Sequence, residues 1–302
     1  MIRSLAAGGV TRASLGVQDF DPVVQKAINR IQPYEQVSEA AQRLRRWGVD
    51  GLSFDLLYGL PHQTSRSIRQ TARLAAGLSP DRISAFGYAH VPWFAKHQRA
   101  IATDALPDLE MRFEQFEVLA ETLVSEGYVP IGLDHFARSD DSLAQAAAGG
   151  RLKRNFQGYT TDDCQTLIAL GPSGISAFSQ GYAQSHKNIS EWRSAVEAGR
   201  LPVCRGIALT EEDKVRRTII ERLMCDFTVD VDAVCASAGY PPDRIYPSFL
   251  KLAPMQQAGF CRVEQSRVSV LPDARSFVRT VAQAFDAYAA GEEDRPRHAG
   301  AI

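Results

Sequence analysis

GLSFDLLYGLP, the stretch from Gly51 to Pro61, is a short apolar run with one carboxylate inside it and a glycine- and proline-containing turn at its end. An apolar run of this length between turn residues is typical of a strand buried on both faces of a parallel sheet. Helical patterns flank it, from Glu35 to Trp47 before it and from an N-cap at Thr64 to about Leu78 after it. The stretch therefore predicts one strand of a βαβ unit.

Two further runs repeat the pattern on either side. Val10 to Val17 and Arg82 to Ala89 are also short and apolar, and helical stretches separate the three runs. The nearly regular repeat suits consecutive units of a (β/α) barrel or an open doubly wound sheet, and both bind ligands beyond the carboxyl ends of their strands. Position alone therefore makes Gln18, Asp55 and the segment Tyr88-Ala89-His90 candidate site residues.

The pattern changes after residue 89. The expected elements are an amphipathic helix at 107–127, a strand at 128–133, a polar loop-like stretch at 154–161 and an apolar, glycine-containing segment at 167–178. The last third predicts helices at 210–224, 229–238, 243–259 and 276–290, with a small hairpin formed by 261–263 and 267–271. We therefore expect an α/β domain over residues 1–205 and a mainly helical, winged-helix-like domain over residues 206–302, with a loose charged tail from Gly291 to His298.

The composition is ordinary for a globular protein, with 302 residues, 45% of them hydrophobic and 23% charged. A net charge of −1 favours neither nucleic acid nor an anionic membrane as partner. No stretch approaches the roughly 18 consecutive apolar residues of a transmembrane helix. The first residues lack the apolar core of a secretory signal, so we expect a cytoplasmic location, and we expect a monomer.

The cysteines do not form a recognisable ligand set. Five are present, and no two are close enough for a CxxC-type pair: Cys164, Cys204, Cys225, Cys235 and Cys261. Metal and iron–sulfur sites need ligands that converge, usually from close pairs in the sequence. An odd count without a secretory signal also argues against a disulfide framework. We therefore expect no metal site in this chain.

Asp55 needs a chemical explanation, because a carboxylate inside an apolar strand must be paired or must bind a ligand. A structural partner such as Arg30 or Arg82 explains it as well as a ligand does. Gln18 can likewise be a ligand-binding amide or an amide that caps a loop. No GxSxG, P-loop or GxGxxG motif is present. The residues alone therefore predict a parallel-sheet protein with a ligand site at its strand ends.

Four segments together resemble the oxygen-independent coproporphyrinogen III oxidase family of radical S-adenosylmethionine enzymes. They are SLGVQDF at 14–20, DLLYGLP at 55–61, DHFAR at 134–138 and RNFQGYTT at 154–161. The first two motifs are shared by the wider family, including its haem-chaperone relatives. The last two are more specific to the oxidase itself.

The resemblance implies the C-terminal half of an incomplete (β/α)6 barrel followed by the winged-helix-like domain, with the three apolar runs as the fourth to sixth barrel strands. Family members bind two S-adenosylmethionine molecules beside a 4Fe–4S cluster. Carried over by motif position, the residues expected to contact the second S-adenosylmethionine are Gln18, Arg30, Asp55 and Ala89. Ile175 is expected to contact the first.

The activity that the resemblance implies is an oxygen-independent oxidative decarboxylation. The reduced cluster cleaves S-adenosylmethionine, the 5′-deoxyadenosyl radical removes a hydrogen atom from a propionate, and loss of carbon dioxide and one electron leaves a vinyl group. Two such steps convert coproporphyrinogen III to protoporphyrinogen IX. Basic residues suit the substrate carboxylates, and the candidates are Arg138, Lys153, Arg154 and Arg205.

The sequence departs from the family at the cluster, because the family's CxxxCxxC motif is absent. We therefore expect this chain alone to bind no 4Fe–4S cluster, to be inactive, and to be unstable with an exposed edge strand at Val10 to Val17. A haem-binding chaperone relative and a non-catalytic tetrapyrrole-binding module are the alternative hypotheses. The DHFAR and RNFQGYTT segments argue against the chaperone relative.

Overall fold

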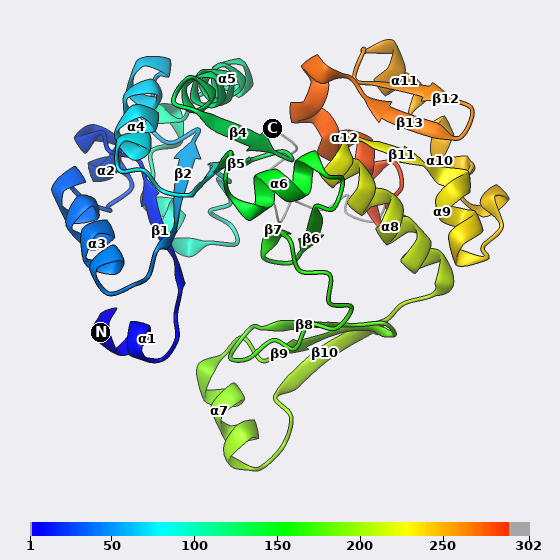
Figure 1. Ribbon diagram of the computed structural model, residues 1–302, viewed down its shortest axis with the longest axis horizontal. Coiled ribbons are helices and arrows are strands. Elements are labelled where there is room, and N and C mark those ends of the chain that lie inside the picture. Colours follow the sequence, from blue (N-terminus) through cyan, green and yellow to red (C-terminus); the bar gives the residue numbers. More distant parts are fainter. Residues whose placement is uncertain (1, 290–302) are drawn as a thin grey trace. The chain divides into compact units, whose positions relative to one another are not determined.

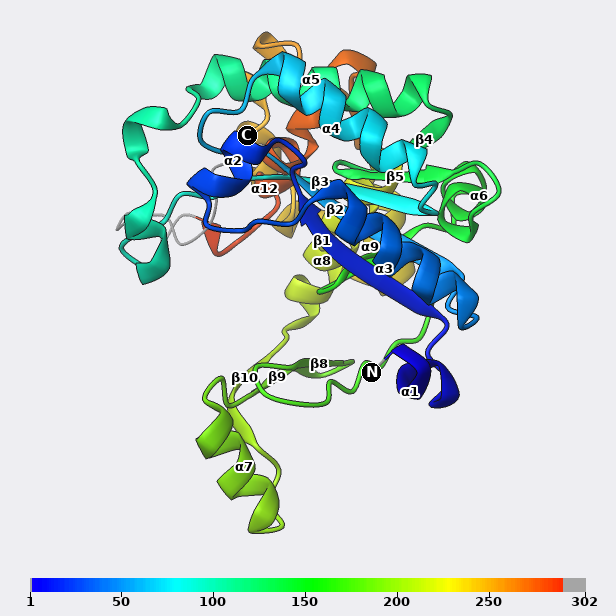
Figure 2. The ribbon, with the colours of Figure 1, turned by 90° about the vertical axis from the view of Figure 1, so that its left-hand side faces the viewer.

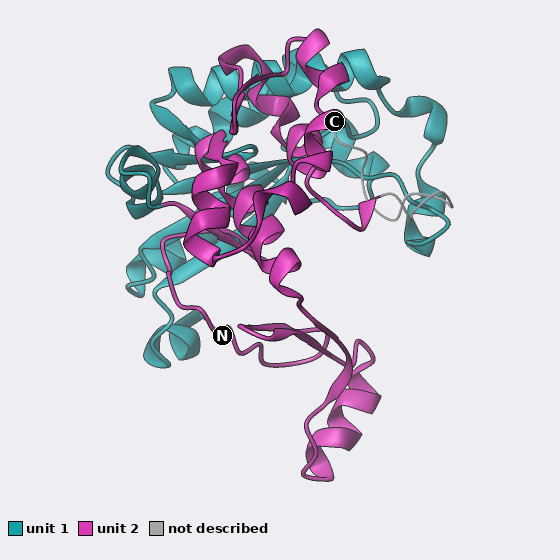
Figure 3. Ribbon diagram, turned by 90° about the vertical axis from the view of Figure 1, so that its right-hand side faces the viewer, with its two compact units in different colours: residues 1–151, 290–302 teal, residues 152–289 magenta. Residues whose placement is uncertain are grey.

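The computed structural model describes residues 2–289, so the predicted tail from Gly291 to His298 lies outside the described residues. The chain divides into two compact units, residues 1–151 and residues 152–289, which Figure 3 shows in separate colours. The domain boundary predicted between residues 205 and 206 lies within the second unit and stays a prediction.

The first unit is an α/β structure (Figure 1). Its strands are β1 (Arg12–Gln18), β2 (Gly51–Tyr58), β3 (Arg82–Gly87), β4 (Tyr128–Ile131) and β5 (His135–Arg138). Its helices are α1 (Ile2–Ala7), α2 (Pro22–Ala27), α3 (Tyr34–Arg46), α4 (Ser65–Gly77), α5 (Leu109–Ser125) and α6 (Ser142–Ala148), with short 3₁₀ turns at Lys96–Ala100 and Thr103–Ala105.

The five strands form one mixed sheet in the order β1-β2-β3-β5-β4. The prediction of three adjacent, parallel strands is confirmed by the pairing of β1 with β2 and of β2 with β3. β5 pairs antiparallel with both β3 and β4, and the sequence did not predict β5 because its residues are too few and too polar to show a strand pattern. Within the described chain, β1 lies at the edge of the sheet, as expected.

The two faces of the sheet differ, and here the prediction of strands buried on both faces is wrong. Burial alternates along β2, with Leu52, Phe54 and Leu56 buried and Ser53, Asp55 and Leu57 partly exposed. Helices α3, α4 and α5 pack on the apolar face (Figure 2) and enclose the core. The opposite face, here called the open face, carries Ser53, Asp55 and Leu57, and Leu57 is the residue that interrupts the alternation of polar and apolar residues in the sequence.

Side-chain caps mark several helix starts and confirm the two predicted at Thr64 and Thr210. The side chain of Asp21 accepts hydrogen bonds from the first backbone N–H groups of α2, with Pro22 at the first helical position. Thr64 begins α4 with a reciprocal capping box, and Thr210 begins α8 in the same way. Each cap of this kind contributes about 1 kcal/mol to helix stability.

The second unit combines short antiparallel sheets with helices. Its strands are β6 (Lys153–Asn155), β7 (Gly158–Thr160), β8 (Ile175–Phe178), β9 (Gly181–Ser185), β10 (Val203–Ala208), β11 (Thr228–Asp230), β12 (Cys261–Glu264) and β13 (Arg267–Val270). Its α-helices are α7 (Ile189–Glu197), α8 (Glu211–Asp226), α9 (Val231–Ala238), α10 (Pro247–Leu250), α11 (Ala253–Gln257) and α12 (Val278–Gln283), with 3₁₀ turns at Pro242–Arg244 and Pro272–Phe277.

The last third has the winged-helix-like composition that was predicted. The predicted hairpin is β12–β13, and β11 joins it as a third strand in the order β11-β13-β12. Three details of this unit differ from the prediction. The stretch at 154–161 is the β6–β7 hairpin rather than a loop. The single helix predicted over 243–259 is divided, since Pro247 and Pro254 each lie in the first two positions of a separate helix. The helix predicted over 276–290 is shorter, since α12 ends at Gln283.

No helix among residues 2–289 combines the length and the apolarity that crossing a membrane requires.

Candidate functional site

Three of the predicted site residues converge around Gly16, near the carboxyl end of β1. The Nη2 atom of Arg30 donates a hydrogen bond of 2.6 Å to the Gly16 carbonyl. Asp55 is the partner of Gly16 in the neighbouring strand β2, so both residues face the same side of the sheet. Gln18 ends β1 with its amide nitrogen close to Gly16.

The lack of a side chain at Gly16 makes this convergence possible. A Cβ atom at that position would lie 2.7 Å from Nε2 of Gln18 and 3.3 Å from Nη2 of Arg30. Any larger residue would therefore displace the amide, the guanidinium or both. Glycine lets the two polar groups approach the strand backbone closely.

Asp55 retains the capacity to bind a ligand. Its carboxylate is partly exposed and accepts a hydrogen bond of 3.0 Å from the hydroxyl of Ser14. Neither of its suggested structural partners forms an ion pair with it in the described chain. Arg82 pairs with Asp141 instead, and Arg30 contacts the backbone of β1. Since each carboxylate oxygen has two lone pairs, Asp55 can accept hydrogen bonds from further donors.

Ala89 lies just beyond β3, at the same carboxyl edge of the sheet as Gln18. Its carbonyl accepts a hydrogen bond of 2.9 Å from Nε2 of Gln98. The preceding residue, Tyr88, accepts one of 3.2 Å from Nη2 of Arg112 on α5. The sequence did not reveal Arg112, because its role appears only when α5 packs against the strand ends.

Ile175 lies in β8 of the second unit, where it is partly exposed and pairs with Gln184 of β9. It therefore belongs to a different unit from the other four predicted residues. Its contact with the first S-adenosylmethionine stays a prediction.

Asp19 lies beside the predicted site residues, and no pattern in the sequence predicted a role for it. It follows Gln18 directly, and it is 0% exposed. Burial raises the pKa of its carboxyl, and hydrogen bonds from Asp21, Gln63 and Thr71 partly offset this rise. One signal was available: Thr71 lies on the apolar face of α4, where a buried hydroxyl needs a partner.

Polar residues continue across the open face of the sheet. Asp55 pairs with Ser84, and Ser84 pairs with His135, so all three share this face. Nδ1 of His135 lies 2.7 Å from Oδ1 of Asp134. An imidazole held by a carboxylate has a defined orientation, so this pair adds a fixed polar group to the face that carries Asp55.

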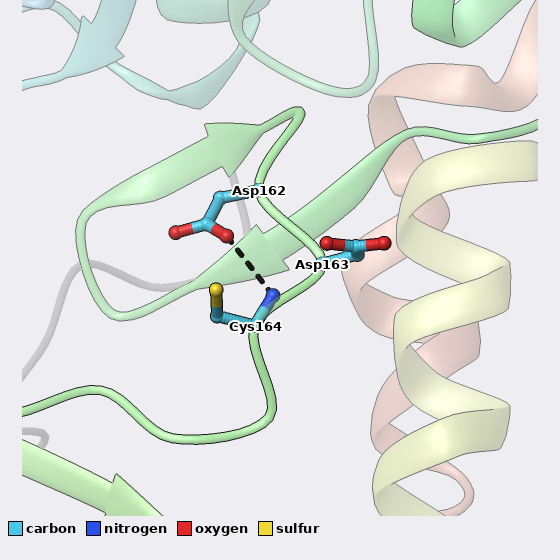
Figure 4. Close-up of side chains that lie close together, drawn as sticks. All are labelled: Asp162, Asp163 and Cys164. Carbon is cyan, nitrogen blue, oxygen red and sulfur yellow. Dashed lines mark hydrogen bonds between the residues drawn. The ribbon is translucent and has the colours of Figure 1, made fainter.

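The described residues do not fit a 4Fe–4S cluster, which requires converging cysteine thiolates. Cys164 and Cys204 are exposed, and the other cysteines are buried in separate elements. Burial raises the pKa of Cys225 to about 12, which keeps its thiol protonated. Within residues 2–289, the one group that could hold a metal ion is Asp162, Asp163 and Cys164 (Figure 4), and it is fully exposed with a single thiol.

The second unit has a pocket of about 920 Å³. Phe156 and Tyr182, two of its apolar lining residues, stack edge to face at 5.0 Å, and Lys153 and Arg154 are the two propionate candidates that line it. The charged lining residues are Lys153, Arg154, Arg216, Arg217 and Arg222 against Asp162, Asp163, Asp213, Glu221 and Asp286. These charges balance, so the pocket offers a polyanionic ligand no net attraction.

Comparisons with known proteins agree with the geometry of both units. Residues 1–75 match the radical SAM superfamily, and residues 209–277 match the HemN C-terminal domain. A solved structure, coproporphyrinogen III oxidase (HemN) from Escherichia coli, described as a radical SAM enzyme, superposes with a TM-score of 0.89 at 37% sequence identity. That match covers 95% of this chain and 66% of the other.

Curated relatives give the same result. The oxygen-independent coproporphyrinogen III oxidase of Bradyrhizobium diazoefficiens is 48% identical over 288 residues, which is 95% of this chain and 64% of the relative. The enzyme of the same name from Helicobacter pylori is 38% identical over 97% of this chain and 64% of its own length. The chain thus spans just under two thirds of the length of these relatives. On the residues that match, it belongs to the oxygen-independent coproporphyrinogen III oxidase family of the radical SAM superfamily.

Proposed function

We propose that this chain is the S-adenosylmethionine-binding part of an oxygen-independent coproporphyrinogen III oxidase. In that reaction two propionates of coproporphyrinogen III are oxidatively decarboxylated, and protoporphyrinogen IX is formed. The observation that carries the proposal is the convergence of Gln18, Arg30 and Asp55 around Gly16 in a member of this family. Ala89 completes the proposed set for the second S-adenosylmethionine.

Each converging group suits a different part of S-adenosylmethionine. The Arg30 guanidinium suits the ligand's carboxylate, and the Asp55 carboxylate suits hydroxyl or ammonium donors. The Gln18 amide can both donate and accept. When bound, S-adenosylmethionine supplies the carbon radical that removes hydrogen from a propionate. The residues of this chain hold and orient S-adenosylmethionine at the open face of the sheet.

The chain by itself is expected to bind S-adenosylmethionine without turnover, because the described residues offer no three converging thiolates for a cluster. The net charge of −1 favours no nucleic-acid partner, and a cytoplasmic monomer stays the prediction for location and oligomeric state. Arg138, Lys153, Arg154 and Arg205 stay candidates for the substrate carboxylates.

The first test of this function is a calorimetric titration with S-adenosylhomocysteine, a stable analogue. We expect the chain to bind it, and Asp55→Asn to weaken binding about tenfold through loss of a charge-assisted hydrogen bond. Asp50→Asn, an exposed carboxylate just before β2, is the matched control and should bind normally. Equal binding by both variants would place the ligand elsewhere.

The second test concerns the reaction. The part of the Bradyrhizobium relative that this chain does not match is joined to the chain, and anaerobic formation of protoporphyrinogen IX is measured. The chimera should be active, and the Asp55→Asn chimera should lose most of that activity. If a spectroscopic titration instead shows that the chain binds one haem per molecule, and the chimera forms no product, the haem-chaperone alternative is favoured.

A further inference from the structure

Gln18 is held in a strained backbone turn. Its φ is 67°, and the N–H of Asp19 donates a hydrogen bond of 2.9 Å to the carbonyl of Val17. A bond between residues two apart across a positive φ defines the rarer and more strained kind of γ-turn. Residues in such conformations persist only where the surroundings impose them, and they concentrate at ligand sites.

The buried side chain of Asp19, the residue that closes this turn, is held by several hydrogen bonds. Its Oδ1 atom accepts hydrogen bonds from the N–H of Asp21 at 2.6 Å and from the hydroxyl of Thr71 at 2.8 Å. Its Oδ2 atom accepts one from Nε2 of Gln63 at 2.5 Å. Its backbone carbonyl accepts another from Gln25 at 2.8 Å. Residue 19 is therefore anchored to α2, to α4 and to the turn after β2.

Gln63 carries the same network to the end of β2. Its amide nitrogen also donates to the Leu57 carbonyl at 2.8 Å, and its amide oxygen accepts from the N–H of Leu60 at 3.1 Å. Gln115 of α5 donates to the Gln63 carbonyl at 2.9 Å and accepts from the N–H of Gly59 at 2.9 Å. The ends of β1 and β2 are thus joined through buried hydrogen bonds.

We infer that Asp19 is a positioning residue, which holds Gln18 in the strained turn and so keeps its amide over Gly16 beside Arg30 and Asp55. The identity of the ligand in this inference rests on the proposed function, whereas the turn at Gln18 does not depend on it. Because Asp19 is 0% exposed, it can act on a ligand only through Gln18.

The test uses Asp19→Asn, which keeps the shape of the side chain. The new amide group faces Nε2 of Gln63, so two donors oppose each other. Gln63 cannot relieve this by turning its amide over, because its oxygen is committed to the N–H of Leu60. We expect amide exchange of Asp19 and Leu60 to accelerate at least tenfold, and the Kd for S-adenosylhomocysteine to rise at least tenfold.

A double variant restores the donor–acceptor match between positions 19 and 63. In Asp19→Asn with Gln63→Glu, the asparagine amide donates to the new carboxylate, which still accepts from the N–H of Leu60 but no longer donates to the Leu57 carbonyl. Because that one bond is lost, we expect the double variant to recover part of the exchange protection and of the affinity that Asp19→Asn loses. Should Asp19→Asn fail to fold, Thr71→Val leaves the Asp19 carboxylate in place and removes the hydroxyl that donates to it and accepts from the N–H of Phe20. It should give the same effects, severalfold smaller.

Tyr128→Phe is the stability control. It removes a buried hydrogen bond to Pro80, at the amino ends of the strands, and should leave both the turn and the Kd unchanged. If Asp19→Asn alters neither exchange nor affinity, or if Tyr128→Phe alters them equally, the inference is overturned. If exchange changes at the turn but the unaltered chain binds no S-adenosylhomocysteine, the proposed function fails and the positioning role stands.

Discussion

The two ends of the parallel strands in the first unit are held in different ways. At the amino ends, Asp81 accepts a hydrogen bond of 2.7 Å from the N–H of Leu52, and Arg45 donates to the carbonyls that end α4. Tyr128 donates to the carbonyl of Pro80 at 2.7 Å. These contacts tie chain segments together, and each involves a group in a common conformation.

At the carboxyl ends, buried polar groups hold a rare conformation. Ser79, at the amino ends, also has a positive φ of 53°, but it follows a helix, where a left-handed residue is common. Gln18 has its positive φ at the end of a strand, and it presents its side chain to the open face. The difference is that the polar contacts at the amino ends join segments in common conformations, whereas those at the carboxyl ends surround a rare one, at the residue that the proposed function assigns to ligand binding.

The largest expected effect lies at the amino ends. Asp141→Ala removes the partner of Arg82, whose Nε lies 3.0 Å from the carboxylate, and it also removes the N-cap of α6. Because the pair is largely buried, we expect a loss of about 3 kcal/mol in the free energy of unfolding, measured with urea. Affinity for S-adenosylhomocysteine should not change.

The control is Arg43→Ala, which breaks an exposed ion pair with Glu39 and should change the free energy of unfolding by less than about 0.5 kcal/mol. A large fall in ligand affinity for Asp141→Ala at a temperature where it stays folded would contradict the division between the two ends.

The next effect is on binding. Arg30→Ala removes an exposed guanidinium, so the free energy of unfolding should change by less than about 0.5 kcal/mol. The Kd for S-adenosylhomocysteine should rise about tenfold, which equals about 1.4 kcal/mol. Arg46→Ala, exposed on α3, is the matched control. If both arginine variants bind alike, Arg30 has no role in the site.

A smaller effect depends on pH. Burial raises the pKa of Tyr128 to about 12 from a usual value of 10.0. Its phenol therefore ionises first in the unfolded chain, and its contribution to stability is complete below about pH 10 and is lost as the pH rises toward about 12. Tyr128→Phe should lose about 1 kcal/mol at neutral pH and should show a shallower decline at alkaline pH. Parallel pH curves for the two proteins would show that Tyr128 does not titrate in this way.

The smallest effect on stability is expected at Gly16. In Gly16→Ala the new methyl group meets the flexible ends of Gln18 and Arg30 rather than backbone, so stability should change by no more than about 0.5 kcal/mol. The Kd for S-adenosylhomocysteine should nevertheless rise about threefold, since both ends must move. Gly77→Ala, which meets no atom within 4 Å, should leave the Kd unchanged. An unchanged Kd in Gly16→Ala would show that the amide and the guanidinium need not approach Gly16.

Local patterns predicted the secondary structure well where a segment was long or capped. The three parallel strands, the helix starts at Thr64 and Thr210, and the final hairpin are all observed. Short elements such as β5 and β6 escaped prediction, because three or four residues show no period. The open face of β2 also escaped it, since a leucine on that face hides the alternation.

The sequence by itself determined the class of the fold, the family resemblance and the candidate residues Gln18, Arg30 and Asp55. Only the tertiary structure decided that these three meet around Gly16 and that buried hydrogen bonds anchor Asp19 directly after Gln18. The physical reason is the range of the contacts. Asp19 lies 44 positions from Gln63 and 52 from Thr71, and a periodic pattern reports which face of an element is apolar but not which distant donor will meet a buried carboxylate.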